Sequence, residues 1–301
     1  MTQEIRKSGI ITICGRPNVG KSTLTNALVG EKVAIVTNKP QTTRNRICGI
    51  RNRGESQFVF VDTPGLHKAR TRLGDYMVNV VRESVADVDA IMLLVEPIAN
   101  IGGPEQQLID RIKTLGCPSV LVINMVDTLE QKEKLLEVIA TYQQACDFTA
   151  IVPIAAKTGE GVEELMNVLE GFLPEGPQLF PEDMTSDQPE RQMMAEILRE
   201  KLLLSLDKEI PHGTAVEITR FAERDDEVIE VEATIYCEKN SHKGIIIGKG
   251  GAMLKKVSTA ARHEMERFMG TKVYLQTWVK VKENWRDNPA AIQNFGYRCD
   301  N

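Results

Sequence analysis

Short apolar runs alternate with longer amphipathic stretches through the first half of the chain. The apolar runs are rich in β-branched residues and predict strands at residues 10–14, 47–50, 58–61, 90–95, 120–123 and 151–154. Between them, helical patterns occupy residues 23–29, 73–86, 105–115, 129–145 and 162–172. Because strands and helices alternate, we expect an α/β domain built on a mostly parallel sheet.

The pattern changes beyond residue 173. Prolines and acidic residues accumulate over residues 174–189, break both periodicities, and predict a linker. After it the pattern predicts a helix at 190–206, strands at 214–221 and 228–236, helical segments at 245–249 and 252–269, a strand at 272–281 and a short helix at 289–294. We therefore expect two domains, an α/β domain at 1–173 and a smaller α+β domain at 190–301.

Composition excludes several classes of protein. Of the 301 residues, 42% are hydrophobic and 26% are charged, with a formal net charge of -5, which is typical of a globular protein. The six cysteines lie far apart without a C-x-x-C pair, which argues against a disulfide framework or a zinc site. No apolar run approaches the roughly 20 residues of a spanning helix, and the run at 10–14 is too short for a secretory signal. We therefore expect a cytoplasmic protein.

The segment between the first predicted strand and the helix after it matches the phosphate-binding pattern G-x-x-x-x-G-K-[ST]. In such a loop, glycines let successive backbone N–H groups face a phosphate chain, the lysine neutralises β and γ oxygens, and the hydroxyl ligates Mg²⁺. The following helix adds its positive N-terminal end. We therefore expect a nucleoside triphosphate to bind at Gly15, Arg16, Pro17, Asn18, Val19, Gly20, Lys21, Ser22 and Thr23.

A D-x-x-G motif follows the third predicted strand and comprises Asp62, Thr63, Pro64 and Gly65. A carboxylate at this position can reach Mg²⁺ through water, and a glycine N–H can approach the γ-phosphate closely. The same four residues are also ordinary turn chemistry, so it is the place of the motif after a strand that favours a role in nucleotide binding.

An N-x-x-D motif, made of Asn124, Met125, Val126 and Asp127, follows the strand predicted at 120–123. It stands where the translation-factor class of GTPases has its guanine-reading N-K-x-D, and the chain resembles that superfamily. Asp127 can accept hydrogen bonds from the ring N–H and the exocyclic amine of guanine, whereas adenine offers no matching donors. The resemblance further implies that Asn124 braces neighbouring loops and that the Ala156 N–H, followed by Lys157, contacts the base oxygen.

Two positions depart from that superfamily. Met125 replaces the lysine of N-K-x-D, which loses a charged donor, and Ala155 replaces the serine of S-A-K, which loses a hydroxyl. We therefore expect weaker affinity for guanine nucleotides than is usual. Leu66 stands where Ras-like proteins have a water-orienting glutamine, and since an alkyl group cannot polarise water, we expect slow intrinsic hydrolysis.

The polar loop at 40–44 resembles the first switch of small bacterial GTPases. In this resemblance Thr43 matches the threonine that closes over Mg²⁺ beside Ser22 and Asp62, with Thr42 as the alternative register. Asn18 matches a residue that holds K⁺ near the β/γ-bridging oxygen in a subset of these enzymes. The cofactors implied are thus Mg²⁺ and K⁺, and the catalytic residues implied are Asn18, Lys21, Thr43 and Gly65.

The second domain carries the loop G-x-x-G between two helical segments, a pattern that ordinary helix–turn–helix punctuation can also produce. Because a helix and two strands precede it and a strand follows, the arrangement resembles a KH domain of type II. Such a loop lets a sugar–phosphate backbone approach main-chain atoms. The stretch 239–286 holds 11 basic and 3 acidic side chains, which indicates a basic face. We expect RNA to bind at Ile247, Gly248, Lys249, Gly250, Gly251, Lys243, Lys255 and Lys256. We expect Trp278 to be a core residue, with a base-stacking platform as the alternative.

The combination of both domains resembles the Era-type family of bacterial ribosome-assembly GTPases over nearly the whole chain. This resemblance implies a monomeric enzyme that converts GTP to GDP and phosphate, binds the 3′ end of 16S rRNA, assists small-subunit assembly, and associates peripherally with the inner membrane. GTP would act on RNA binding through the linker at 174–189. Two alternatives are an RNA-binding scaffold whose GTP site has decayed and a metabolic P-loop kinase, against which the second domain argues.

Overall fold

The computed structural model describes residues 7–66, 71–84, 88–131, 133–224 and 227–297. The chain divides into two compact units, and each unit is made of three separate segments of the sequence. The first unit contains residues 1–34, 43–68 and 77–187, and the second contains residues 35–42, 69–76 and 188–301. Each unit has its own hydrophobic core.

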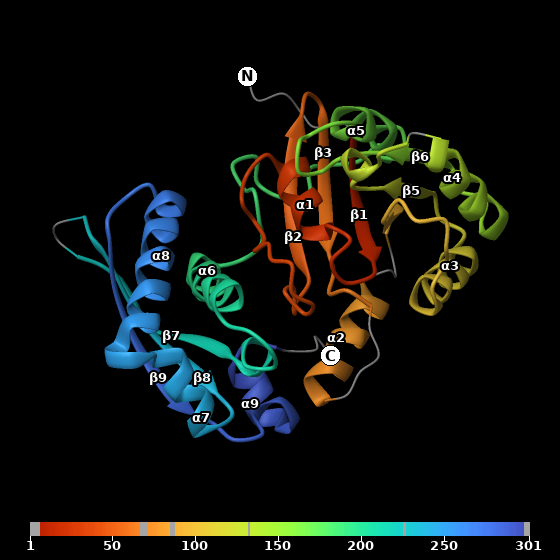
Figure 1. Ribbon diagram of the computed structural model, residues 1–301. Helices are drawn as coiled ribbons and strands as arrows, with labels where there is room; N and C mark the ends of the chain where they lie inside the picture. Colours follow the sequence, from red (N-terminus) through yellow and green to blue (C-terminus); the bar gives the residue numbers. More distant parts are fainter. Residues whose placement is uncertain (1–6, 67–70, 85–87, 132, 225–226, 298–301) are drawn as a thin grey trace. The chain divides into compact units, whose positions relative to one another are not determined.

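The first unit is built on a six-stranded sheet (Figure 1). Its strands are β1 (Lys7–Gly15), β2 (Ile47–Arg53), β3 (Ser56–Asp62), β4 (Ala90–Val95), β5 (Ser119–Ile123) and β6 (Ala150–Pro153), in the order β2-β3-β1-β4-β5-β6. Only β2 pairs antiparallel, with β3, and the other pairs are parallel. The expected mostly parallel sheet is therefore confirmed.

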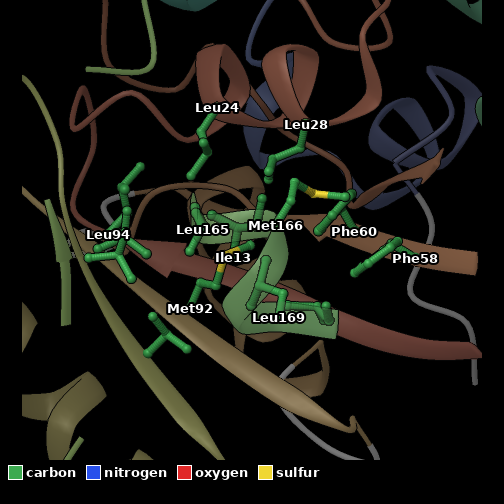
Figure 2. Close-up of a cluster of buried hydrophobic side chains, with 14 of the residues drawn as sticks. Ile13, Leu24, Leu28, Phe58, Phe60, Met92, Leu94, Leu165, Met166 and Leu169 are labelled. Carbon is green, nitrogen blue, oxygen red and sulfur yellow. The ribbon is translucent and has the colours of Figure 1, made fainter. Parts of the chain in front are cut away.

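Helices cover both faces of this sheet. They are α1 (Lys21–Val29), α2 (Arg72–Glu83), α3 (Gly103–Leu115), α4 (Glu133–Ala145) and α5 (Val162–Glu170). On one face, Leu24 of α1 and Leu165 of α5 join Ile13 and Phe60 in a buried cluster (Figure 2). A second cluster joins α3 and α4 to the opposite faces of β4 and β5. Because both faces are covered, every residue of β4 and β5 is buried, which explains their continuous apolar runs.

The second unit is a three-stranded sheet covered by helices. Its elements are α6 (Glu190–Ser205), β7 (Ala215–Glu223), β8 (Ile229–Cys237), α7 (Asn240–Ile247), the turn η3 (Lys249–Gly251), α8 (Ala252–Met269), β9 (Val273–Val281) and α9 (Pro289–Asn294). The strand order is β7-β8-β9, with β7 antiparallel and β9 parallel to β8. Apolar side chains of α6 and α8 pack on β8 to form the core. The expected order of helix, strand, strand, helix, helix, strand is confirmed.

Three expectations about these elements are wrong. The helix expected from residue 129 begins at Glu133, because residues 126–128 form a 3₁₀ turn, η1 (Val126–Thr128). The helical segment expected at 245–249 is α7, which begins at Asn240 and ends at Ile247. Trp278 is 43% exposed and is not a core residue; the buried tryptophan is Trp285, at 0%.

The expected linker at 174–189 is bonded to the first unit over much of its length. The N–H of Ile50 donates to the carbonyl of Thr185 (2.8 Å), and the N–H of Cys48 donates to Asp187 Oδ1 (3.0 Å). Gln57 Oε1 accepts from the N–H of Phe180 at 2.9 Å. Residues up to 187 therefore belong to the first unit. In the part of the chain that the structure describes, no helix has the length and apolar character required to span a membrane.

Candidate nucleotide-binding and RNA-binding sites

Four motif segments meet at one edge of the first unit's sheet, because parallel strands present their carboxyl ends together. The phosphate loop follows β1, the D-x-x-G motif follows β3, the N-x-x-D motif follows β5, and residues 155–157 follow β6. The structure therefore gathers at one place segments that are up to 142 residues apart, counting from Gly15 to Lys157.

Two glycines allow these segments to touch. Gly20 has a left-handed φ of 95°, and a Cβ there would lie 2.3 Å from Asn124 Nδ2. A Cβ on Gly65 would lie 2.7 Å from both the Cα and the backbone N of Pro17. Since real Cβ contacts are longer than 3.0 Å, neither position accepts a side chain without displacement of its neighbour. The D-x-x-G glycine is thus packed directly on the phosphate loop.

Three oxygen-bearing side chains form a cluster beside the loop. Ser22 Oγ donates to Asp62 Oδ2 at 2.7 Å and lies 2.8 Å from Thr43 Oγ1. Asp62 is fully buried, and its Oδ1 has no hydrogen-bond partner among the described residues. Burial raises the pKa of Asp62 to about 6, although Ser22 and Lys21 act in the opposite direction. A buried carboxylate oxygen without a partner, next to two hydroxyls, fits Mg²⁺, which prefers oxygen ligands.

Thr42, the alternative ligand, faces elsewhere. Its Oγ1 lies 2.6 Å from Thr37 Oγ1 and donates to the carbonyl of Lys39 at 2.7 Å. The geometry therefore favours Thr43 over Thr42 as the switch threonine.

Lys21 lies beneath the phosphate loop with its ammonium directed at the loop's own main chain. Its Nζ donates to the carbonyl oxygens of Arg16 (2.7 Å) and Gly15 (3.2 Å). The side chain is buried, and burial lowers its pKa to about 8, while the carboxylate of Asp62 works against this shift. A buried ammonium held among carbonyl oxygens is suited to charged phosphate oxygens, which form stronger hydrogen bonds than neutral acceptors do.

Asn124 connects the loops around the expected base position. It is buried, and its Nδ2 donates to the carbonyl of Val19 (2.8 Å) while its Oδ1 accepts from the N–H of Ala156 (3.0 Å). This is the bracing arrangement expected from the sequence. The Ala156 N–H already has this partner, so its contact with a base oxygen stays a prediction. Asp127, in η1, is exposed at the same edge of the sheet, where its carboxylate is accessible to a ligand.

Sequence reasoning missed an ionic network beside the phosphate loop, of which Glu105 is the buried member. Arg16 Nε lies 2.8 Å from Glu105 Oε1, and its Nη2 lies 3.2 Å from Glu96 Oε2. Glu105 is 0% exposed, and its Oε2 accepts from the N–H of Gly102 at 2.9 Å, a capping interaction at the start of α3. Burial, followed by the Glu105 carboxylate, raises the pKa of the Tyr142 hydroxyl. The signal available in the sequence was a glutamate at the third position of a helix, which indicates a cap but not its arginine partner.

In the second unit, the G-x-x-G loop exposes its main chain between α7 and α8. Gly248 adopts φ 75° and ψ 173°, which only glycine reaches easily, and a Cβ there would lie 2.7 Å from Met253 Cβ. Gly250 and Gly251 have left-handed φ values of 59° and 81°, and an added Cβ would meet nothing within 4 Å. The loop is therefore sharply bent and open to an approaching chain.

Lysines surround this loop. Lys243 lies on α7, Lys249 lies in η3, and Lys255 and Lys256 lie in the first turns of α8. None of the four has an ion-pair partner among the described residues, whereas Arg262, further along α8, is paired with Glu266 at 2.7 Å. Ile247 ends α7 and packs partly against the core. All eight residues expected to bind RNA thus lie on α7, on the loop or at the start of α8.

Comparisons with known proteins agree with both halves of the chain. A family model described as a 50S ribosome-binding GTPase matches residues 10–125, and a KH-domain model matches residues 209–286. The chain is 50% identical to a GTPase Era of Ruminiclostridium cellulolyticum over 294 residues, which covers 98% of each protein. It belongs to the GTPase Era family. An Era GTPase of Alkaliphilus metalliredigens is 48% identical and covers 97% of this chain.

Solved Era structures share the fold. One is an Era variant of Aquifex aeolicus bound to GDP and AlF₄⁻, with a TM-score of 0.94, 37% identity, and coverage of 97% of this chain and 100% of that one. Another is Era in complex with MgGDPNP and nucleotides 1506–1542 of 16S ribosomal RNA, with a TM-score of 0.94, 36% identity and coverage of 98% and 100%. As an Era GTPase, this chain converts GTP to GDP and phosphate. That activity excludes the metabolic kinase.

Proposed function

We propose that this GTPase binds the 3′ end of 16S rRNA through its KH domain and thereby assists assembly of the small ribosomal subunit. The observation that carries the proposal is the exposed G-x-x-G loop with four lysines around it, in the same chain as a complete phosphate-loop cluster. The Era structure described with a fragment of 16S rRNA supports the choice of RNA, since it matches this chain over nearly its full length. The proposal includes a cytoplasmic location, which membership of the Era family supports.

At the nucleotide site, each group has a distinct role. Ser22, Thr43 and Asp62 would hold Mg²⁺, which when bound neutralises negative charge on the phosphate oxygens. Lys21 neutralises the β and γ oxygens, and Gly65, which packs on the loop, would offer its N–H to the γ-phosphate. Asp127 accepts hydrogen bonds from guanine, while Asn124 holds the loops around it.

Slow hydrolysis without a bound activator follows from Leu66. Its side chain is buried in the apolar cluster formed by β4, β5, α3 and α4, and its N–H donates to the carbonyl of Gly15 at 3.2 Å. No polar group at this position is available to orient water. We propose that K⁺ near Asn18 supplies positive charge beside the phosphate oxygens, where it stabilises the negative charge that develops during hydrolysis.

The backbone conformation of Asn18 offers an explanation that competes with the potassium proposal. Asn18 has a left-handed φ of 67°, which asparagine tolerates well, so the residue could serve the turn of the loop rather than bind an ion; its side chain is exposed. Asn18→Gly keeps this backbone conformation and removes the side-chain amide. We expect the unaltered protein to hydrolyse GTP faster in potassium than in sodium buffer of equal ionic strength, and the variant to lose the difference. Equal rates of the unaltered protein in both buffers contradict the proposal.

The RNA proposal is tested by charge placed on the glycine loop. Gly250→Asp sets a carboxylate where a phosphate backbone would approach, and it does so in open space. Gly270→Asp is a matched control, because Gly270 ends α8, has φ 67° and also has nothing within 4 Å. We expect Gly250→Asp to weaken binding of a single-stranded 16S 3′-end oligonucleotide at least tenfold and Gly270→Asp to leave it unchanged. Equal binding by both variants contradicts the assignment.

We also propose that the protein is a monomer with a peripheral association with the inner membrane. The resemblance to the Era-type family supports this, and light scattering of the purified chain measures the oligomeric state. Co-flotation with vesicles of inner-membrane lipid composition tests the association, and protein that stays at the bottom of the gradient contradicts it.

A further inference from the structure

Residues 35–42, which lead into the switch residue Thr43, belong to the second unit and not to the nucleotide-binding unit. Within this segment, Gln41 has a left-handed φ of 62°, and Thr42 Oγ1 donates to the carbonyl of Lys39 at 2.7 Å. The segment is therefore a tight, internally bonded turn. Its next residue, Thr43, counts with the first unit and contacts Ser22 there.

Two buried charged residues of α6 are directed at the main chain of this turn. Glu200 Oε1 accepts from the N–H of Val36 at 2.9 Å, near the start of the segment. Arg199 Nη2 donates to the carbonyl of Thr42, at its end. Arg199 and Glu200 are 1% and 3% exposed, so each would be costly to bury without such partners. Lys39 adds a third attachment through the carbonyl of Leu206.

The two side chains are themselves held in place on the second unit. Glu196 pairs with Arg199, and Lys201 Nζ lies 2.6 Å from Glu200 Oε2 and 3.3 Å from Glu264 Oε2 of α8. Burial acts against the charge of Arg199, but Glu196 more than compensates, so its pKa is raised and the guanidinium stays charged. The last carbonyl before Thr43 is thus bonded to the unit that carries the G-x-x-G loop.

We propose that Arg199 and Glu200 are positioning residues for the nucleotide site, which hold residues 36–42 so that Thr43 reaches Ser22 and Asp62. The consequence is a link between GTP and RNA binding that runs through the switch segment and α6. It replaces the expected route through residues 174–189, which are bonded to the first unit as far as residue 187. This inference rests on the proposed RNA-binding function only for its consequence; the positioning of Thr43 is independent of it.

Loosening the segment before Thr43 should change the nucleotide preference. Thr43 contributes to nucleotide binding only when Mg²⁺ and a γ-phosphate are present, so a looser segment weakens binding of a GTP analogue and leaves GDP binding intact. For Glu200→Ala and for Lys39→Ala we expect the ratio of GDPNP to GDP affinity to fall, roughly tenfold for Glu200→Ala, in line with loss of a hydrogen bond to a charged group. The Mg²⁺ concentration for half-maximal hydrolysis should rise in both variants.

Controls separate positioning from general damage. Glu200→Gln keeps an acceptor for the Val36 N–H and should restore most of the GDPNP preference. Glu209→Gln and Lys208→Asn remove the same charges from exposed positions just beyond α6 and should change neither ratio. Lys39→Ala leaves the core intact, so it keeps the test valid if Glu200→Ala does not fold. An unchanged GDPNP to GDP ratio in folded Glu200→Ala or Lys39→Ala overturns the proposal.

Binding of the 16S 3′-end oligonucleotide to the same proteins separates this inference from the proposed function. If the unaltered protein binds the RNA more tightly with GDPNP than with GDP, Glu200→Ala should abolish that difference. If the unaltered protein does not bind the RNA at all, the proposed function fails while the nucleotide ratios still decide the role of α6. A GDPNP-dependent difference in RNA affinity that survives in Glu200→Ala refutes the link through α6.

Discussion

The Arg16–Glu105 pair offers the sharpest test of how the phosphate loop is held. Glu105→Gln removes one charge of a pair whose nitrogen and oxygen lie 2.8 Å apart, and it keeps an oxygen for the Gly102 N–H. Removing one partner of a buried ion pair costs about 3–5 kcal/mol, whereas an exposed pair contributes about 0.2–1 kcal/mol. Because the Arg16 side chain is 30% exposed while Glu105 is fully buried, we take a value between these limits, about 1.5–2 kcal/mol.

The expected loss has two readouts. A loss of 1 kcal/mol lowers the Tm of a domain of this size by about 2–4 °C, so Glu105→Gln should unfold roughly 3–8 °C earlier by differential scanning calorimetry. Since Arg16 supplies a carbonyl to Lys21 within the phosphate loop, GDP affinity should also fall several-fold. Glu137→Gln, on the exposed surface of α4, is the matched control and should change neither quantity. A variant with unchanged Tm and unchanged GDP affinity would refute the idea that the Arg16–Glu105 pair supports the loop.

Two further predictions concern packing. Gly65→Ala puts a Cβ 2.7 Å from the backbone of Pro17, so the D-x-x-G segment must move away from the phosphate loop. GDPNP affinity measured by calorimetry should fall at least tenfold, and GDP affinity should fall less. Gly103→Ala, with nothing within 4 Å, should bind both nucleotides normally, and equal losses of the two affinities in Gly65→Ala would contradict the prediction. Trp285→Phe deletes a buried indole N–H that donates to the carbonyl of Gly213 at 2.9 Å and leaves that acceptor unpaired, so the free energy of unfolding in urea should fall by about 1–3 kcal/mol. Trp278→Phe, at a 43% exposed position, should lower it by less than about 0.5 kcal/mol. A larger loss for Trp278→Phe than for Trp285→Phe would contradict the assignment of Trp285 to the core.

The strands of the first unit were predictable because burial on both faces leaves a plain signal. All six residues of β4 are buried, and the apolar run in the sequence has the same limits as the strand. The start of α7 was not predictable, since its first turn, from Asn240, is polar and carries no apolar period. Trp278 shows a second limit. Alternation along β9 identifies two faces, but the sequence does not say which of them another element covers.

The sequence predicted part of the candidate site and missed another part. Contiguous motifs such as the phosphate loop and the D-x-x-G segment were visible because their chemistry needs particular residues at fixed spacing. Contacts between residues far apart in the chain were not visible. Arg16 and Glu105 are 89 positions apart, and Thr42 and Arg199 are 157 apart, so no local pattern joins them. These contacts depend on how the strands and helices pack, which a single sequence does not specify residue by residue.

The proposed function and the proposed link through α6 both require that one chain joins a GTP site to an RNA site and that the first site acts on the second. The most direct measurement is the affinity of the full chain for a single-stranded oligonucleotide of the 16S rRNA 3′ end, with Mg²⁺ and either GDPNP or GDP. We expect tighter binding with GDPNP, and no comparable binding of a DNA oligonucleotide of the same sequence. Equal affinities with the two nucleotides, or no binding of the RNA with either, would contradict it.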